Sequence, residues 1–221
     1  MIEFRPFLLT VELALITTFV LFFVGVPIAY YLANTKSRLK PIFESVVALP
    51  LVLPPSVLGF YFLLAFSDEG FLGLPYKAVF DKQLAFSFEG LVIGSVVFSL
   101  PFIVHPVLSG FEGVEKNLKD AAKTLGKSGF EIFYKLELPL IKSSLLTGCV
   151  LAFAHTVGEF GVVLMIGGNI DGVTRVASIA IYDKVESFDY LSAHMYSAIL
   201  FAFSFLILFA VYKLNKKRVF A

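Results

Sequence analysis

The sequence has little charge, one cysteine, three histidines and no tryptophan. Only 16% of its 221 residues are charged and 58% are hydrophobic, with a mean hydropathy of +0.86. That composition excludes an ordinary soluble globular domain. The formal net charge of +1 excludes the strong basic field typical of nucleic-acid binding. A lone cysteine, Cys149, cannot form an intrachain disulfide, and its apolar surroundings favour a buried thiol without a chemical role.

Long apolar stretches make up most of the sequence. Each of five stretches reaches the roughly 20 residues that a membrane-spanning helix needs. They predict an all-α integral membrane protein, one domain over residues 1–221, with about five transmembrane helices. The first stretch is too long for a signal-peptide core and lacks a clear cleavage site, so we interpret it as a retained span. The predicted spans are residues 8–33, 42–66, 88–111, 140–166 and 193–214.

The segment between the last two spans contains VTRVASIAIYDKVES, residues 173–187. Its charges and its length of ~14 residues argue against a full crossing. We expect a short helix at the outer rim, with a re-entrant or sixth membrane segment as the alternative.

Lysine and arginine are unevenly divided between the two sides that five spans define. Thirteen of the 18 fall on the side that holds residues 34–41, residues 112–142 and the C-terminal tail. Cytoplasmic loops carry the excess of these residues, so we predict that this side is cytoplasmic. The N-terminus is then outside and the C-terminus is inside.

The longest loop on the predicted cytoplasmic side, residues 112–139, contains DAAKTLGKSG. Its Gly126-Lys127-Ser128 matches the last three residues of a phosphate-binding loop. The complete motif needs a glycine five residues before Gly126, but Ala121 stands there. The preceding EKNLKDAAKTL is rich in helix formers, and the sequence predicts no parallel strands for a nucleotide-binding domain. The chain is therefore not expected to hydrolyse ATP.

This loop is instead predicted to form two short helices separated by a turn. Leu118, Ala121, Ala122 and Leu125 have the spacing of one helical face. Gly126 is expected to end the first helix, because glycine accepts the left-handed backbone common at helix ends. GFEIFYKLEL is expected to form the second helix. Two interpretations stay open: the first helix packs on its own bundle, or its small alanines allow another protein to approach closely.

Proline interrupts the second predicted span in LPLVLPPSVLG, residues 49–59. Pro50, Pro54 and Pro55 each remove a backbone donor and clash with a continuous helix. In hydrocarbon, the freed groups need protein or a water-filled cavity. The break therefore indicates either a kinked packing helix or part of a pathway, and we take Pro54, Pro55 and Ser56 as candidate pathway residues.

The fourth predicted span carries His155, Thr156 and Glu159. Ionisable groups inside a membrane usually face the bundle interior or water, so Thr156 and Glu159 join the candidate pathway. For Glu159 we favour a structural partner such as His155, or a backbone donor of another protomer. The alternative is a charge that repels an anion and so prevents its trapping.

Another class of protein is a haem- or metal-binding membrane oxidoreductase using His105, His155 and His194. The sequence has no C-x-x-C-H, no histidine pair at helical spacing and no carboxylate cluster with ligand spacing. We therefore expect no metal and no cofactor in this chain. A membrane scaffold without transport is a further alternative, but it leaves the 112–139 loop unexplained.

A family resemblance rests on three stretches and covers essentially the whole chain. DAAKTLG followed by ELPLI resembles the EAA loop of ABC importer permeases, with Asp120 in place of the glutamate and Glu137 in place of an isoleucine. LPLVLPPSVLGFYFLL and the stretch from Gly158 to Tyr190 resemble molybdate-type permeases, relatives of the sulfate and tungstate permeases. Asp171 stands where that family usually has proline.

The resemblance implies a type I ABC importer permease: a helical bundle with a cytoplasmic coupling helix. Two copies would form the pathway, two ATPase subunits would bind ATP and Mg, and a soluble binding protein would deliver the anion. Asp120, Ala121, Ala122 and Gly126 match the motif and would couple the chain to the ATPase.

The implied substrate is molybdate, with sulfate, thiosulfate or tungstate as alternatives, moved by alternating access. The implied location is the inner membrane of a bacterial or archaeal cell. The ATP chemistry would belong to the assembled ABC-type translocase and not to this chain.

Overall fold

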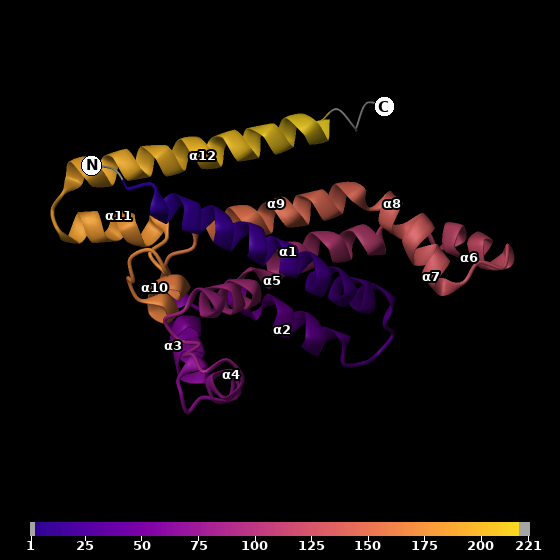
Figure 1. The fold of residues 1–221 in the computed structure, drawn as a ribbon. Coiled ribbons are helices and arrows are strands. Elements are labelled where there is room, and N and C mark those ends of the chain that lie inside the picture. Colours follow the sequence, from indigo (N-terminus) through magenta and orange to yellow (C-terminus); the bar gives the residue numbers. More distant parts are fainter. Residues whose placement is uncertain (1–2, 217–221) are drawn as a thin grey trace.

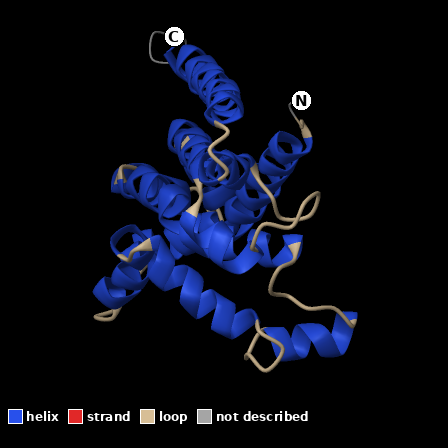
Figure 2. Cartoon of the chain, turned by 90° about the vertical axis from the view of Figure 1, so that its left-hand side faces the viewer, coloured by secondary structure: helices blue, strands red, loops and turns tan. Residues whose placement is uncertain are grey.

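The computed structural model describes residues 3–216, and within them the chain forms helices and loops without strands (Figure 2). Among the described residues, three helices are long and apolar enough to cross a membrane by themselves: α1 (Arg5–Asn34), α5 (Phe88–Glu112) and the Tyr190–Phe209 part of α12 (Tyr190–Lys216). Two bent helix pairs raise the number to as many as five. The prediction of an all-α membrane protein with about five spans is confirmed. Residues 217–221, the end of the predicted cytoplasmic tail, lie outside the described residues.

The centre of the bundle is formed by α1, α5 and α9 (Lys142–Gly158), which pack on one another. Small residues bring their backbones close together around Ile103 of α5. A Cβ atom on Gly25 of α1 would lie 2.6 Å from the Ile103 side chain, and one on Gly148 of α9 would lie 3.1 Å from it. Small residues at such crossings are how membrane helices gain close packing.

The predicted proline break is present. Helix α2 (Lys40–Val52) ends just before Pro54, and α3 (Pro55–Phe66) leaves at an angle of 108°. The short helix α4 (Gly73–Phe80) follows α3. Residues 42–66, predicted as one span, are therefore two helices that point in different directions.

The range predicted as the fourth span, 140–166, is also broken. Before it come α7 (Gly129–Ile132), the π-helix η1 (Phe133–Glu137) and α8 (Leu138–Leu140), and the helix direction changes by 72° at Ile141. Helix α9 then ends at Gly158, and α10 (Gly161–Gly167) is a separate short helix.

The short helix expected within residues 173–187 is α11 (Ala177–Glu186), which packs against α12. Figure 1 places α4, α10 and α11 at one end of the bundle and α6 (Lys116–Thr124) with α7 at the opposite end. The 112–139 loop and the loops before and after α10 therefore lie on opposite sides of the molecule.

Candidate coupling segment and pathway

Helix α6 is the predicted first helix of the 112–139 loop, and it buries none of its residues. Its apolar residues Leu118 and Ala121, with Leu125 directly after it, are exposed, while Ala122 is half-buried. Asp120 is exposed as well and lies 3.8 Å from Lys123 of the same helix. Of the two open interpretations, packing on the chain's own bundle is therefore wrong for most of the apolar face.

Gly126 ends the helix as expected. Its φ angle is +74°, a left-handed conformation that glycine adopts without the clash of a Cβ atom. The Gly126 N–H donates to the carbonyl of Lys123, and the Lys127 N–H donates to the carbonyl of Ala122. This pair of bonds is the Schellman motif, which satisfies carbonyls left free at a helix end.

The turn continues directly into a capped second helix. The Ser128 hydroxyl accepts from the Glu131 N–H, and the Glu131 carboxylate accepts from the Ser128 N–H, which forms a capping box. Hydrogen bonds from Lys135 and from the Ser128 backbone, with the charge of Lys127, lower the pKa of Glu131 to about 2. Residues 126–131 therefore set the angle between α6 and α7 by local bonds.

The sequence did not predict the ion pair that connects α6 to η1. The Lys119 Nζ lies 2.5 Å from Oε1 of Glu137, whose side chain is only 2% exposed. The Tyr30 side chain of α1 lies beside the Glu137 carboxylate. A glutamate inside the apolar run YKLELPLI was the available signal, since a buried carboxylate needs a partner.

In the candidate pathway, the structure brings the two helix breaks together. Pro55 at the start of α3 packs on Gly161 at the start of α10, where a Cβ atom would lie 2.7 Å from the Pro55 side chain. Pro54, Pro55 and Ser56 are exposed, whereas Thr156 and Glu159 are buried. The five candidates therefore do not share one surface within this chain.

Thr156 belongs to a closed hydrogen-bond cluster. Its hydroxyl donates to the carbonyl of Ala152, and Ser99 of α5 lies 3.1 Å from it and 2.9 Å from Nδ1 of His155. The His155 ring also stacks on Phe102. Within residues 3–216, no three His, Cys, Asp or Glu side chains come together as metal ligands.

Glu159 lies at the break between α9 and α10 and is 4% exposed. Its carbonyl accepts from the Ser178 hydroxyl, so the break has a backbone partner. Neither carboxyl oxygen has a hydrogen-bond partner among the described residues, although Ser95 lies close by. The expected pairing with His155 is wrong, because His155 bonds Ser99 instead.

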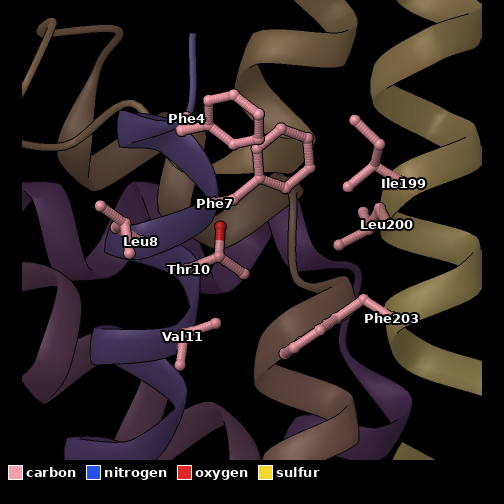
Figure 3. Close-up of a pocket in the computed structure, with 8 residues that line it drawn as sticks. All are labelled: Phe4, Phe7, Leu8, Thr10, Val11, Ile199, Leu200 and Phe203. Carbon is pink, nitrogen blue, oxygen red and sulfur yellow. The ribbon is translucent and has the colours of Figure 1, made fainter. Parts of the chain in front are cut away.

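A separate cavity of about 200 Å³ lies between α1 and α12 (Figure 3). Its lining is apolar except for Thr10. The Thr10 hydroxyl already donates to Pro6 and accepts from the Ala177 N–H. The cavity therefore offers no free donor to an anion.

Residues 25–220 match a known family, described as the binding-protein-dependent transport system inner membrane component. The chain is 48% identical over 204 residues to the molybdenum transport system permease protein ModB of Azotobacter vinelandii, across 92% of this chain and 90% of that protein. It is 33% identical over 220 residues to the probable sulfate transport system permease protein cysT of Chlorella vulgaris, across 99% of this chain and 82% of that protein.

Among solved structures, a bacterial alginate ABC transporter, in complex with an alginate pentasaccharide-bound periplasmic protein, superposes with a TM-score of 0.79. The match covers 96% of this chain and 78% of that one at 14% identity, so it shows the fold. Family, relatives and fold agree, and the chain belongs to the inner membrane components of binding-protein-dependent transport systems.

Proposed function

We propose that this chain is the permease subunit of an ATP-driven molybdate importer. The similarity to ModB carries the substrate assignment, because it combines 48% identity with coverage of 92% of the chain. The sulfate relative is 33% identical, so sulfate is the second candidate. Molybdate and sulfate are both tetrahedral dianions, and the described spans offer hydroxyls and helix ends to such an ion.

Coupling to ATP hydrolysis is assigned to α6 and the turn after it. Asp120, Ala121, Ala122 and Gly126 lie on or directly after a helix that buries none of its residues. An exposed apolar helix face at one end of a membrane bundle is the form of a docking surface. The partner is a separate ATPase subunit that binds ATP and Mg, while this chain hydrolyses nothing.

The pathway is assigned to the region where the α2–α3 and α9–α10 breaks meet. Pro54, Pro55 and Ser56 are exposed there, and a second copy of the chain would complete the enclosure. Glu159 is buried at the α9–α10 break, with both carboxyl oxygens without a hydrogen-bond partner among the described residues. A soluble binding protein would deliver the anion from outside, and alternating access would release it to the cytoplasm.

Uptake of labelled molybdate tests this function. The complete transporter is expressed with its ATPase and binding protein in cells that lack their own molybdate uptake. We expect ATP-dependent accumulation of molybdate that excess tungstate suppresses. Accumulation of labelled sulfate without accumulation of molybdate would overturn the substrate assignment, and no accumulation of either anion would overturn the function.

A further inference from the structure

The ion pair between Lys119 and Glu137 differs from every other ion pair among the described residues. The Glu137 side chain is 2% exposed and that of Lys119 is 18% exposed, whereas each partner in the other pairs is more exposed. Exposed ion pairs contribute little to stability because water screens them. Breaking a buried ion pair is costly, because it leaves a buried charge without a partner. Lys119 and Glu137 therefore form a fixed connection between α6 and η1.

The connection extends from η1 into the bundle. The Tyr30 side chain of α1 lies beside the same Glu137 carboxylate. The Tyr30 ring lies 4.6 Å from the ring of Phe133 in η1 and 5.2 Å from that of Phe111 at the end of α5. Tyr30 of α1 thus contacts η1 through its ring and lies next to the Glu137 carboxylate.

Helix α6 has few other routes to the membrane helices. It buries none of its residues, and its Asp120–Lys123 ion pair lies within the helix itself. Its apolar residues Leu118 and Ala121 stay exposed. Besides the chain connections at its two ends, Lys119 gives α6 an ion pair with another element of the protein.

We propose that Lys119, Glu137 and Tyr30 form a link that carries the movement of α6 into α1 and α5, and that this link is required for coupled transport. The proposal rests on the proposed function, in which an ATPase subunit binds α6. These are positioning residues, since none of them is a candidate pathway residue. The exposed face of α6 binds the ATPase, and the inward side of α6 transmits its movement.

The direct test is the number of anions moved per ATP hydrolysed by the complete transporter in proteoliposomes. In Glu137→Gln, the exposed face of α6 is unchanged, so we expect the ATPase to remain bound and ATP hydrolysis to continue. Transport per ATP is expected to fall roughly 2- to 30-fold, the range by which single substitutions change coupling. An assembled Glu137→Gln transporter with the wild-type ratio would overturn the proposal.

Glu131→Gln is the matched control. Glu131 is a carboxylate of the same loop that also pairs with lysines, Lys127 and Lys135. Its partners all lie within the loop and it does not reach α1. Glutamine also completes a capping box, so the turn is kept and we expect the transport-to-hydrolysis ratio of this variant to equal that of the wild type. A loss as large as in Glu137→Gln would overturn the proposal, because it would show that removing any carboxylate of this loop uncouples transport.

A double variant covers the case in which Glu137→Gln does not fold. Lys119→Met/Glu137→Met removes both charges together and leaves no buried charge without a partner, a change that proteins often tolerate. We expect it to assemble and to stay uncoupled. The exchanged pair Lys119→Glu/Glu137→Lys is expected to recover coupling. Normal coupling in the Met/Met variant would mean that the pair only stabilises the fold, which would overturn the proposal.

A crosslink provides a test in which a covalent connection replaces the ion pair. With Cys149 replaced by alanine, Lys119→Cys and Glu137→Cys are joined by a short bifunctional thiol reagent. We expect the joined transporter to keep its transport, because α6 and η1 move together. Loss of transport on joining, with recovery when a cleavable reagent is cut, would show that the two must separate and would overturn the proposal.

The wild-type transporter in the same vesicles separates the two hypotheses. If it moves no anion at all, the proposed function fails. If it transports normally and the Lys119, Glu137 and Tyr30 variants keep its ratio, only the proposed link fails. Tyr30→Phe, which keeps the ring contacts and removes the hydroxyl, is expected to give a smaller loss than Glu137→Gln.

Discussion

At the scale of single residues, the polar groups inside the bundle fall into two kinds. Ser99, His155 and Thr156 bond one another and a backbone carbonyl, so they are satisfied within the chain. The side-chain oxygens of Thr17, Thr18, Ser95 and Glu159 are buried without hydrogen-bond partners among the described residues. Buried polar groups normally have partners, so the bonded cluster is expected to contribute to stability.

Ser99→Ala is expected to destabilise the chain without abolishing transport. It leaves Nδ1 of His155 without its partner, and such a buried unpaired group costs about 1–3 kcal/mol. The unfolding midpoint should fall by about 2–4 °C for each kcal/mol. The half-buried thiol of Cys149 allows a thiol-reactive dye to follow unfolding in detergent.

Ser45→Ala is the control for this variant. Its hydroxyl also donates to a backbone carbonyl, that of Pro41, but it does so at the surface. We expect its midpoint to match the wild type. An unchanged midpoint in Ser99→Ala would show that the buried cluster contributes nothing to stability.

Residue type alone selected Thr156 and Glu159 as candidates, and it could not separate their roles. Both are buried polar residues on the same helix end, one turn apart. Their difference comes from neighbours distant in sequence, since Ser99 lies 57 residues before Thr156. The Lys119–Glu137 pair escaped prediction for the same reason, because its two residues lie on different elements of a folded loop.

At the scale of elements, local signals predicted some breaks and missed others. Pro54 and Pro55 indicated the α2–α3 break, because proline acts on its own turn. The α9–α10 break contains no proline, and its free Glu159 carbonyl is satisfied by Ser178 of α11. A break that depends on another helix cannot be found from the sequence around it.

The end of α6 gives a prediction about Gly126. No atom lies within 4 Å of a Cβ atom placed there, so only the left-handed backbone opposes substitution. That conformation costs an L-residue ~1–2 kcal/mol, and a β-branched side chain is worse. Gly126→Val is therefore expected to insert normally in the membrane but to lose anion uptake, measured together with copurification of the ATPase subunit.

Gly129→Ala is the control for Gly126→Val. It also removes a glycine from this loop, but without placing a side chain at a left-handed backbone position. A Cβ atom at Gly129 also meets nothing within 4 Å, but its φ is not positive. We expect uptake close to that of the wild type. Normal uptake and normal ATPase binding in Gly126→Val would refute the role given to this helix end.

At the scale of the whole molecule, the distribution of charge predicts the orientation. The loop with α6 and the loops around α10 lie at opposite ends (Figure 1), and the lysine excess assigns the α6 end to the cytoplasm. With Cys149 replaced by alanine, Lys127→Cys should react with a membrane-impermeant thiol reagent only when the cytoplasmic face is accessible. Lys77→Cys should react from outside intact cells, and the reverse pattern would overturn the orientation.

Composition and hydropathy predicted the fold class because burial in lipid requires helices with long apolar surfaces. They could not predict how helices lie against one another. The crossing around Ile103 depends on Gly25 and Gly148, which are 123 residues apart in the chain. Such matches appear only when the helices are packed.

Helix α12 stands apart in how little of it the rest of the chain covers. Only 11% of its apolar membrane window is buried, against 56% for α5. Its uncovered side faces lipid acyl chains or a neighbouring subunit. When the protein is extracted, a detergent micelle has to replace those contacts. The choice of surfactant during purification therefore acts most strongly on this last helix.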